Sequence, residues 1–174
     1  MVTKKSIWVL FGILSISAWV LGSAIQAGAE TLNYKFYTWV NKGEIVPIGD
    51  VEGHSVTLIM RGAFYVFENG EVATTDTVTI GDLTKGSGSF KGYFTIKFGD
   101  GSTIMVKTQG TLGGTAAGAL GSSGATSEII KGTGRFEGIK GTQSAKTKYL
   151  PLGKGEVAPK GYGEGTITYT LPPK

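Results

Sequence analysis

The chain has 174 residues, including 29 glycines, with 40% hydrophobic residues and a formal net charge of +4. This glycine content is more than twice the usual ~7%, but the hydrophobic share excludes both collagen and a disordered polar chain, so a globular domain remains. The absence of cysteine excludes disulfide scaffolds, thiolate nucleophiles, zinc–cysteine clusters and iron–sulfur centres. The single histidine, His54, excludes most zinc sites with two or three histidines and any Ser-His-Asp triad not built on it.

The N-terminal segment has the order of a secretory signal peptide. Two adjacent lysines precede an apolar run over residues 7–21, and an Ala-Gly-Ala sequence ends at Ala29. A basic start, an apolar middle and an A-x-A site are typical of a signal peptide. We therefore expect residues 1–29 to be cleaved and the protein to be periplasmic or extracellular. The alternative is a membrane anchor through residues 6–28, because this uncharged stretch is long enough to span a bilayer.

The charge of the remaining domain, residues 30–174, is nearly balanced. Cleavage would remove two lysines and leave 15 basic and 13 acidic residues, a net charge of +2. The lysines are spread among the predicted strands, whereas a nucleic-acid site would gather them on one face. We therefore expect no nucleic-acid partner, and no stable membrane insertion once the signal peptide is removed.

The domain reads as one antiparallel β-domain. Short segments rich in Thr, Val, Ile, Phe and Tyr alternate with Gly, Asn and Asp turns. In chain order, strands are predicted over residues 33–40, 44–48, 56–67, 72–80, 90–98, 103–112, 128–136, 143–150 and 162–171. Eight or nine strands in one small domain would close into a barrel or stack as a sandwich, which removes unpaired edges.

Turns and connections between these strands have their own signatures. Asn69-Gly70 suits a type I′ hairpin, because both central residues need positive φ. Residues 99–102 supply a second reversal with Gly and Asp. Residues 113–127 have almost no large side chain, which predicts a mobile loop at the barrel rim. Residues 151–160 form the last long connection.

Alternation along the strands assigns side chains to the two faces of the sheet. The clearest strand, residues 90–98, places Phe94, Ile96 and Phe98 inside and its lysines outside. In the hairpin before it, the inner face is predicted to hold Val56, Leu58, Met60, Gly62, Phe64 and Val66, then Val72, Thr74, Asp76, Val78 and Ile80. The opposite face of residues 56–67 is more apolar than a solvent-exposed surface needs to be, which predicts self-association.

Asp76 is the carboxylate that this parity places among apolar residues. Burial raises the pKa of a carboxyl group, and a raised pKa in a cavity is what general acid or base catalysis uses. Asp76 is therefore the candidate catalytic residue. The alternative is a structural role, in which a bulge turns Asp76 outward or its carboxylate holds a backbone amide.

Three other sites carry two interpretations each. Arg61 and Tyr65 share a face and could hold an anion together, or could form a surface or interface pair. Tyr149 could place a hydroxyl group in a cavity, or could pack in the core with its hydroxyl group satisfied. His54, just before a strand, could be a catalyst or a histidine of the surface or rim.

The segment GTGRFEGIKG at residues 132–141 carries a recognisable motif. The pattern GTG-x-F-x-G-x-x-G resembles that of dirigent proteins and the wider allene oxide cyclase-like barrel superfamily. Residues 86–93 and 99–104 look like uncharacterised exported members of the same superfamily. The glycines would let the chain bend sharply at the rim while Phe136 plugs the barrel end.

The resemblance implies an eight-stranded antiparallel β-barrel, frequently trimeric, with a hydrophobic cavity. Characterised relatives cyclise an unsaturated epoxide or guide the coupling of phenoxy radicals, both without a bound cofactor. Together with the residue pattern, it predicts an exported homo-oligomeric barrel that holds a small lipophilic molecule, as a binding protein or as a cofactor-independent cyclase-like or isomerase-like catalyst. The predicted ligand-binding residues are Phe64, Val66, Phe94, Ile96, Phe98, Val106 and Tyr149, with no metal. The alternative is a non-catalytic structural or interaction protein whose barrel is packed solid by its own side chains.

Overall fold

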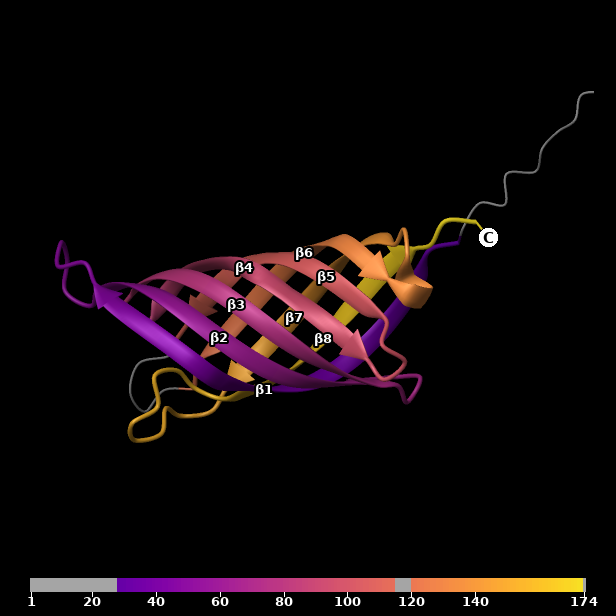
Figure 1. Ribbon diagram of the computed structural model, residues 1–174. Coiled ribbons are helices and arrows are strands. Elements are labelled where there is room, and N and C mark those ends of the chain that lie inside the picture. The colour runs from indigo at the N-terminus through magenta and orange to yellow at the C-terminus, as the bar shows by residue number, and fades with distance from the viewer. Residues whose placement is uncertain (1–27, 115–119, 174) are drawn as a thin grey trace, which may run out of the picture.

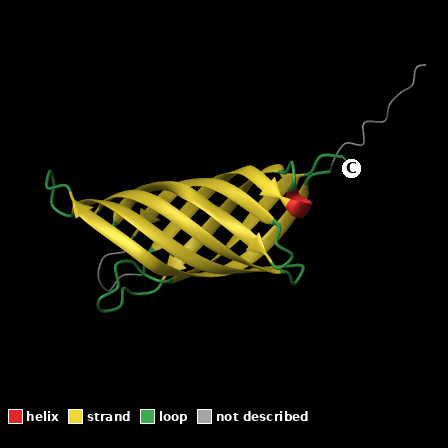
Figure 2. Ribbon diagram, viewed as in Figure 1, coloured by secondary structure: helices red, strands yellow, loops and turns green. Residues whose placement is uncertain are grey.

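The computed structural model describes residues 28–114 and 120–173 and is a closed barrel of eight antiparallel strands (Figures 1 and 2). Each strand pairs with the next along the chain, and β8 pairs with β1. The strands are β1 (Glu30–Pro47), β2 (His54–Phe67), β3 (Val72–Thr84), β4 (Ser87–Phe98), β5 (Thr103–Gly113), β6 (Ser122–Thr133), β7 (Lys140–Tyr149) and β8 (Gly161–Thr170). The predicted barrel is therefore confirmed. The predicted signal peptide, residues 1–29, lies almost wholly outside the described residues.

Both predicted reversals are turns, but the β2–β3 turn is not of the predicted type I′, because φ is positive at Gly70 and not at Asn69. In the β2–β3 turn, Gly70 has φ of +83° and the Asn69 side chain accepts a hydrogen bond from the Glu71 amide at 3.0 Å. In the β4–β5 turn, Asp100 accepts a hydrogen bond from the Ser102 amide at 2.9 Å. These local side-chain bonds set the register of both hairpins.

Three segments differ from the sequence-based prediction. Residues 134–136, predicted as the end of a strand, form a 3-10 helix, because the positive φ of Gly134 ends the extended backbone. β1 is one long strand across the two predicted pieces, with a register shift between Val40 and Lys42. β6 starts at Ser122, so residues 122–127 are strand and the predicted rim loop was wrong there. The small side chains are paired with β5, from Gly113 opposite Ser122 to Thr108 opposite Ser127. Ladder hydrogen bonds to a neighbouring strand outweigh the weak local β-propensity of Gly, Ala and Ser.

Side-chain faces follow the prediction on β4 and contradict it on β2 and β3. Phe94, Ile96 and Phe98 are buried in the barrel. On β2, however, the residues pointing inward are Thr57, Ile59, Arg61, Ala63, Tyr65 and Phe67, and on β3 they are Ala73, Thr75, Thr77, Thr79 and Gly81. The reason is register: opposite residues in an antiparallel pair share a face, and Thr77, Thr75 and Ala73 lie opposite Phe94, Ile96 and Phe98. Small side chains on β3 thus accommodate large ones on β4.

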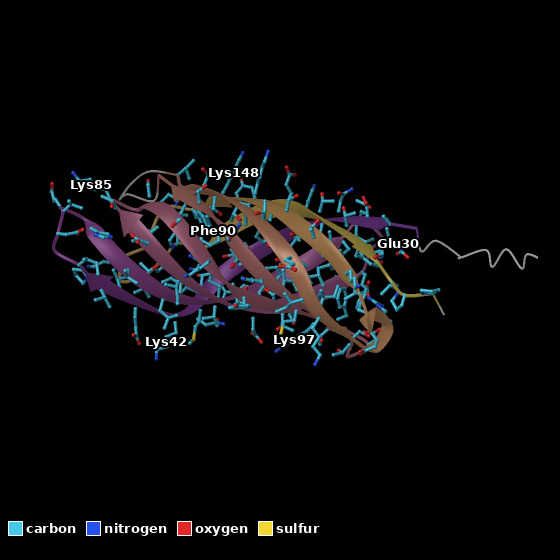
Figure 3. The ribbon with its side chains drawn as sticks, turned by 90° about the horizontal axis from the view of Figure 1, so that it is seen from above. Glu30, Lys42, Lys85, Phe90, Lys97 and Lys148 are labelled. Carbon is cyan, nitrogen blue, oxygen red and sulfur yellow. The ribbon has the colours of Figure 1, made fainter. Side chains whose placement is uncertain are left out.

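The strands leave an outer wall that carries the charges and several large apolar groups. Lys42, Lys97 and Lys148 lie on this wall (Figure 3). Met60, Phe64, Val78, Ile80 and Tyr93 are also exposed on it. The predicted apolar outer face of β2 was therefore wrong, because its residues, such as Ile59 and Tyr65, point inward. The apolar side chains that β2 and β3 do expose are ones that parity in the sequence assigns to the interior.

One end of the barrel, which we call the closed end, is packed solid. It holds the 3-10 helix η1 (Gly134–Phe136), drawn in red in Figure 2, and the buried side chains Phe67, Phe98, Ile104, Phe136, Ile139, Ile167 and Tyr169. The Phe136 ring lies 4.8 Å from that of Phe98, and the Arg135 guanidinium covers both rings at 4.7 and 4.8 Å from their centroids. Phe136 therefore plugs the barrel as its motif predicted.

Glycines of the motif allow this close packing. A Cβ atom on Gly132 would lie 2.1 Å from the Phe136 carbonyl oxygen, and one on Gly141 would lie 2.2 Å from that of Thr168. Gly134 and Gly138 have φ of +63° and +76°, which favour glycine. Across residues 28–114 and 120–173, the structure contains no helix with the length and apolar character that crossing a membrane requires.

Candidate functional site

The opposite end of the barrel, which we call the open end, encloses a cavity of about 360 Å³. Its wall includes the apolar side chains Phe36, Ile59, Ala63, Leu83, Phe90, Phe94 and Leu112. The β7–β8 connection contributes Leu152, Val157, Ala158 and Pro159. This connection and the β1–β2 turn lie at the same end of the barrel (Figure 1). Pockets of this volume with a largely apolar wall are typical of sites for small organic molecules.

Small inward side chains on β3, β6 and β7 create the space. The residues of β6 that line the cavity are Ser123, Ala125 and Ser127, and Ala145 lines it from β7. Their side chains are much smaller than the aromatic rings of the closed end. The same run of small residues that suggests a loop from sequence therefore keeps the lumen of the barrel empty.

Arg61 carries the only formal charge among the described residues that line the cavity. Its Nη1 donates a hydrogen bond to the Pro159 carbonyl at 2.8 Å, and its guanidinium lies 5.4 Å from the Tyr149 ring centroid. No described carboxylate lies within ion-pair distance of Arg61. Burial lowers the pKa of the Arg61 guanidinium, but arginine stays protonated in proteins. The cavity therefore contains a positive charge without an ion-pair partner among the described residues.

Tyr149 stands beside Arg61 at the end of β7. Its side chain is buried, and its hydroxyl group is 3.1 Å from Ser123 Oγ. The Tyr149 hydroxyl group is thus satisfied by a neighbour, while its ring faces the guanidinium. Both sequence interpretations of Tyr149 hold in part, because it lines the cavity and also packs with a partnered hydroxyl group.

A polar cluster forms the floor of the cavity, between the lumen and the closed end. The rings of Tyr34 and Tyr65 stack at 4.7 Å, and Gln143 Nε2 donates a hydrogen bond to the Tyr34 hydroxyl group. Burial raises the pKa of both tyrosines, so both hydroxyl groups stay protonated at neutral pH. Gln143 Oε1 and Thr75 Oγ1 are buried without a hydrogen-bond partner. Buried polar groups without a partner are rare, so these two atoms mark the floor as a site for a polar group.

The predicted ligand-binding residues fall into three groups. Phe94 and Tyr149 line the cavity, so their role as ligand contacts stays a prediction with suitable geometry. Ile96, Phe98 and Val106 are buried in the barrel but lie in its packed core, not on the cavity. Phe64 and Val66 are 43% and 45% exposed on the outer wall, so their placement in the cavity was wrong.

Asp76 is also on the outer wall, where its carboxylate forms an ion pair with Lys97 of β4. The predicted interior carboxylate was therefore wrong, and no bulge is needed to turn it outward. Gly62, the residue opposite Asp76 on β2, lies on the same outer face beneath the Trp39 ring, so the whole row of β3 is inverted relative to the prediction. Among the described cavity residues none is a carboxylate.

The sequence pattern does single out Arg61 and Tyr65, and the structure places both on the cavity. The alternative interpretation, a surface or interface pair, is therefore wrong. Thr75 and Gln143 were missed as site residues. The signal that could have found Thr75 is its position opposite Ile96, since a residue opposite a buried one must also face inward.

His54 lies at the start of β2 at the open end and joins the β1–β2 turn to β3. Its Nδ1 is 2.5 Å from Asp50 Oδ1, and its Nε2 is 2.9 Å from Asp82 Oδ1. The interpretation as a rim histidine fits this geometry, because both ring nitrogens are engaged by carboxylates and His54 does not line the cavity. The hydrogen bond to Asp50, followed by that to Asp82, raises the pKa of His54 above 6.5.

This raised pKa predicts a pH-dependent stability. The protonated ring is favoured in the folded state, so its stabilisation is complete below pH 6.5 and is lost as the pH rises through the folded-state pKa. We expect the melting temperature of the parent protein to exceed that of His54→Gln at pH 5.5, and the difference to shrink by pH 8.5. An equal difference at both pH values would contradict this prediction.

Two other features of the barrel bear on the choice of site. The described residues contain no group of three or more His, Asp or Glu side chains placed to hold a metal ion. A larger hollow of about 1700 Å³ borders all eight strands, but many of its residues, such as Lys35, Lys91 and Lys146, are exposed on the outer wall. The cavity inside the open end is therefore the candidate site.

Comparison with proteins of known structure identifies the fold. No family model matches the chain, and no curated protein matches it significantly. Among solved structures, the pterocarpan synthase dirigent protein PsPTS1 matches with 15% identity and a TM-score of 0.51, over 84% of this chain and 97% of that chain. The pterocarpan synthase dirigent protein GePTS1 matches with 13% identity and a TM-score of 0.52, over 84% of this chain and 92% of that chain. The chain therefore has the dirigent-like β-barrel fold that its glycine motif predicted.

Proposed function

We propose that this protein binds a small lipophilic molecule in the cavity at the open end of the barrel. The observation that carries the proposal is the empty volume of about 360 Å³ between an apolar wall and a densely packed closed end. Small eight-stranded barrels can be filled by their own side chains. The alternative, a structural barrel filled by its own side chains, requires dense packing at both ends. It therefore accounts for the closed end but not for the cavity at the open end.

The fold supports this proposal at a general level. Both matched structures are pterocarpan synthase dirigent proteins, so their names attach small-molecule chemistry to this barrel. At 13% to 15% identity the likeness extends to the fold only. The site therefore has to be argued from its own residues.

A cofactor-independent cyclase-like or isomerase-like reaction on the bound molecule is the second candidate. Arg61 and the neutral hydroxyl group of Tyr65 are donors that face a largely apolar cavity. Such donors stabilise negative charge as it develops on a substrate oxygen, and they do so best where water is excluded. Asp76 has no part in this candidate, because its carboxylate is on the outer wall.

The proposal also includes export of the protein and its association with further copies of the chain. The signal-like N-terminal segment supports a periplasmic or extracellular location, with a retained anchor through residues 6–28 as the alternative. The exposed apolar side chains of β2 and β3 support a contact with a second copy of the chain. Native mass spectrometry of the purified protein would count the subunits and would detect a small molecule that copurifies.

The cavity is tested by filling it. Ala125 points into the lumen and Thr126 points out from the same strand, so Ala125→Phe and Thr126→Phe add similar bulk to opposite faces. We expect the neutral fluorescent probe N-phenyl-1-naphthylamine to bind the parent protein and Thr126→Phe, and to lose at least about tenfold in affinity for Ala125→Phe. Equal binding to both variants, or no binding to the parent, would contradict a lipophilic cavity. Thermal unfolding verifies that both variants fold.

A further inference from the structure

Arg61 is a partly buried cation for which the described residues supply no anion. A guanidinium has five N–H donors, and the structure gives Arg61 one hydrogen bond, to the Pro159 carbonyl. A charge in an apolar cavity costs free energy unless an opposite charge or hydrogen bonds compensate it. The Tyr149 ring offers partial compensation through its face, but a ring carries no net charge. The remaining donors of Arg61 therefore suit an anionic group of a ligand.

The floor of the cavity contains a second, independent feature that suits a polar group of a ligand. Thr75 is 2% exposed and Gln143 is 5% exposed, and each has a buried oxygen without a hydrogen-bond partner. Both side chains line the cavity. A hydroxyl group of a ligand could donate to one of these oxygens, as a bound water molecule would.

The two sites lie at different depths of the lumen. Tyr65 of the floor follows Arg61 by four residues on β2, about 13 Å along an extended strand, and Thr75 lies opposite Ala63, about 7 Å from Arg61 in the same direction. Ala63 lies between the two residues on β2, and Phe90 and Phe94 of β4 add apolar surface to the same cavity. A ligand that contacted both Arg61 and the polar floor would be on the order of 10 Å long, because the Arg61 side chain itself takes up part of this separation.

We propose that the cavity selects a lipophilic anion, whose carboxylate binds Arg61 and whose far end carries a hydroxyl group that reaches Thr75 and Gln143. This inference rests on the proposed function, since it requires a ligand in the lumen, and it adds the chemical class. A guanidinium binds a carboxylate through two parallel hydrogen bonds, which fixes the orientation of the ligand. The apolar middle of the ligand would pack on Phe94 and its neighbours.

The charge requirement is tested with two probes of nearly the same shape. 1-Anilinonaphthalene-8-sulfonate is the anionic counterpart of N-phenyl-1-naphthylamine, so their affinity ratio reports the contribution of the negative charge. We expect Arg61→Met to weaken binding of the sulfonate by about 10- to 100-fold and to change binding of the neutral probe by less than about threefold. Arg61→Lys should restore most of the preference for the anion, because it restores the charge.

A matched control separates a local charge from the total charge. Lys107 is exposed on the outer wall, so Lys107→Met makes the same change in net charge outside the cavity. It should leave both affinities unchanged. If Arg61→Met left the affinity ratio unchanged while the neutral probe still bound, the anion site would be overturned and the lipophilic cavity would stand. Near-UV circular dichroism must match the parent protein, because the sulfonate also binds partly unfolded states.

The polar floor is tested with octanoate and 8-hydroxyoctanoate, which differ by one terminal hydroxyl group. We expect 8-hydroxyoctanoate to displace the neutral probe at about five- to tenfold lower concentration than octanoate does. Thr75→Val removes only the unpaired hydroxyl group and keeps the shape, and it should reduce this preference without loss of folding. Equal displacement by the two acids in the parent protein would overturn the polar floor.

Discussion

Replacing Phe136 by alanine is expected to lower the free energy of unfolding by about 3–5 kcal/mol. Phe136 is 4% exposed and packs against the rings of Phe98 and Tyr169 at 4.8 and 6.1 Å. The truncation would open a void at the one end of the barrel that is packed solid, and it would remove a face on which the Arg135 guanidinium rests. Urea unfolding measures this loss, which is a large part of the roughly 5–15 kcal/mol typical of a domain.

Phe64→Ala is the matched control for this prediction. Phe64 is 43% exposed on the outer wall, so the same truncation there should cost less than about 1 kcal/mol in an isolated subunit. The comparison also tests the orientation of β2, because parity in the sequence places Phe64 inside. Similar losses for the two variants would contradict both the plug and the face assignment.

Replacing Gly132 by alanine is expected to cost about 3 kcal/mol, at the upper end of the roughly 1–3 kcal/mol that overpacking costs in ordinary cores. The new Cβ atom would lie 2.1 Å from the Phe136 carbonyl oxygen and 2.5 Å from Ile139 Cγ2. The carbonyl belongs to the backbone of the motif segment, so the clash can be relieved only by moving the plug away from β6. Thermal unfolding of Gly132→Ala measures this cost.

Gly124→Ala provides the comparison within the same strand. Its Cβ atom would meet nothing within 4 Å. The alanine should leave the free energy of unfolding unchanged or raise it by up to about 1 kcal/mol, because it reduces the freedom of the unfolded chain. Melting temperatures of the two variants distinguish a packing requirement at Gly132 from a general preference for glycine in β6. Equal melting temperatures would show that close packing against Phe136 is not the reason for glycine at position 132.

The closed end and the fold class were accessible from the sequence because their signals are local. The alternation of residues 90–98 is polar on one face and apolar on the other, so it assigns Phe94, Ile96 and Phe98 without reference to any neighbour. The Asn-Gly turn and the positive φ of Gly134 and Gly138 depend on adjacent residues only. The barrel, the positions of both turns and the plugged end are observed as predicted, whereas the type I′ conformation expected at Asn69 is not.

The orientation of β2 and β3 was not accessible in the same way. Both faces of β2 are apolar enough to be buried, so hydrophobicity does not distinguish them. On β3, the outward Val78 and Ile80 are more apolar than the inward Thr77 and Thr79, and a rule that places the more apolar groups inside gives the inverted answer. The assignment depends on pairing with β4, where large inward rings leave room only for small neighbours.

By itself, the sequence determined that the chain forms antiparallel strands, where most of them turn, and which glycine-rich segment closes one end, because these depend on backbone preferences and contacts between near neighbours. Only the tertiary structure decided that Arg61 points into the lumen, that Asp76 does not, and that a cavity remains beside Thr75 and Gln143. A cavity is a difference between the volume that eight strands enclose and the volume that their inward side chains fill. That difference depends on register and closure around the whole barrel, which no single segment of the sequence contains.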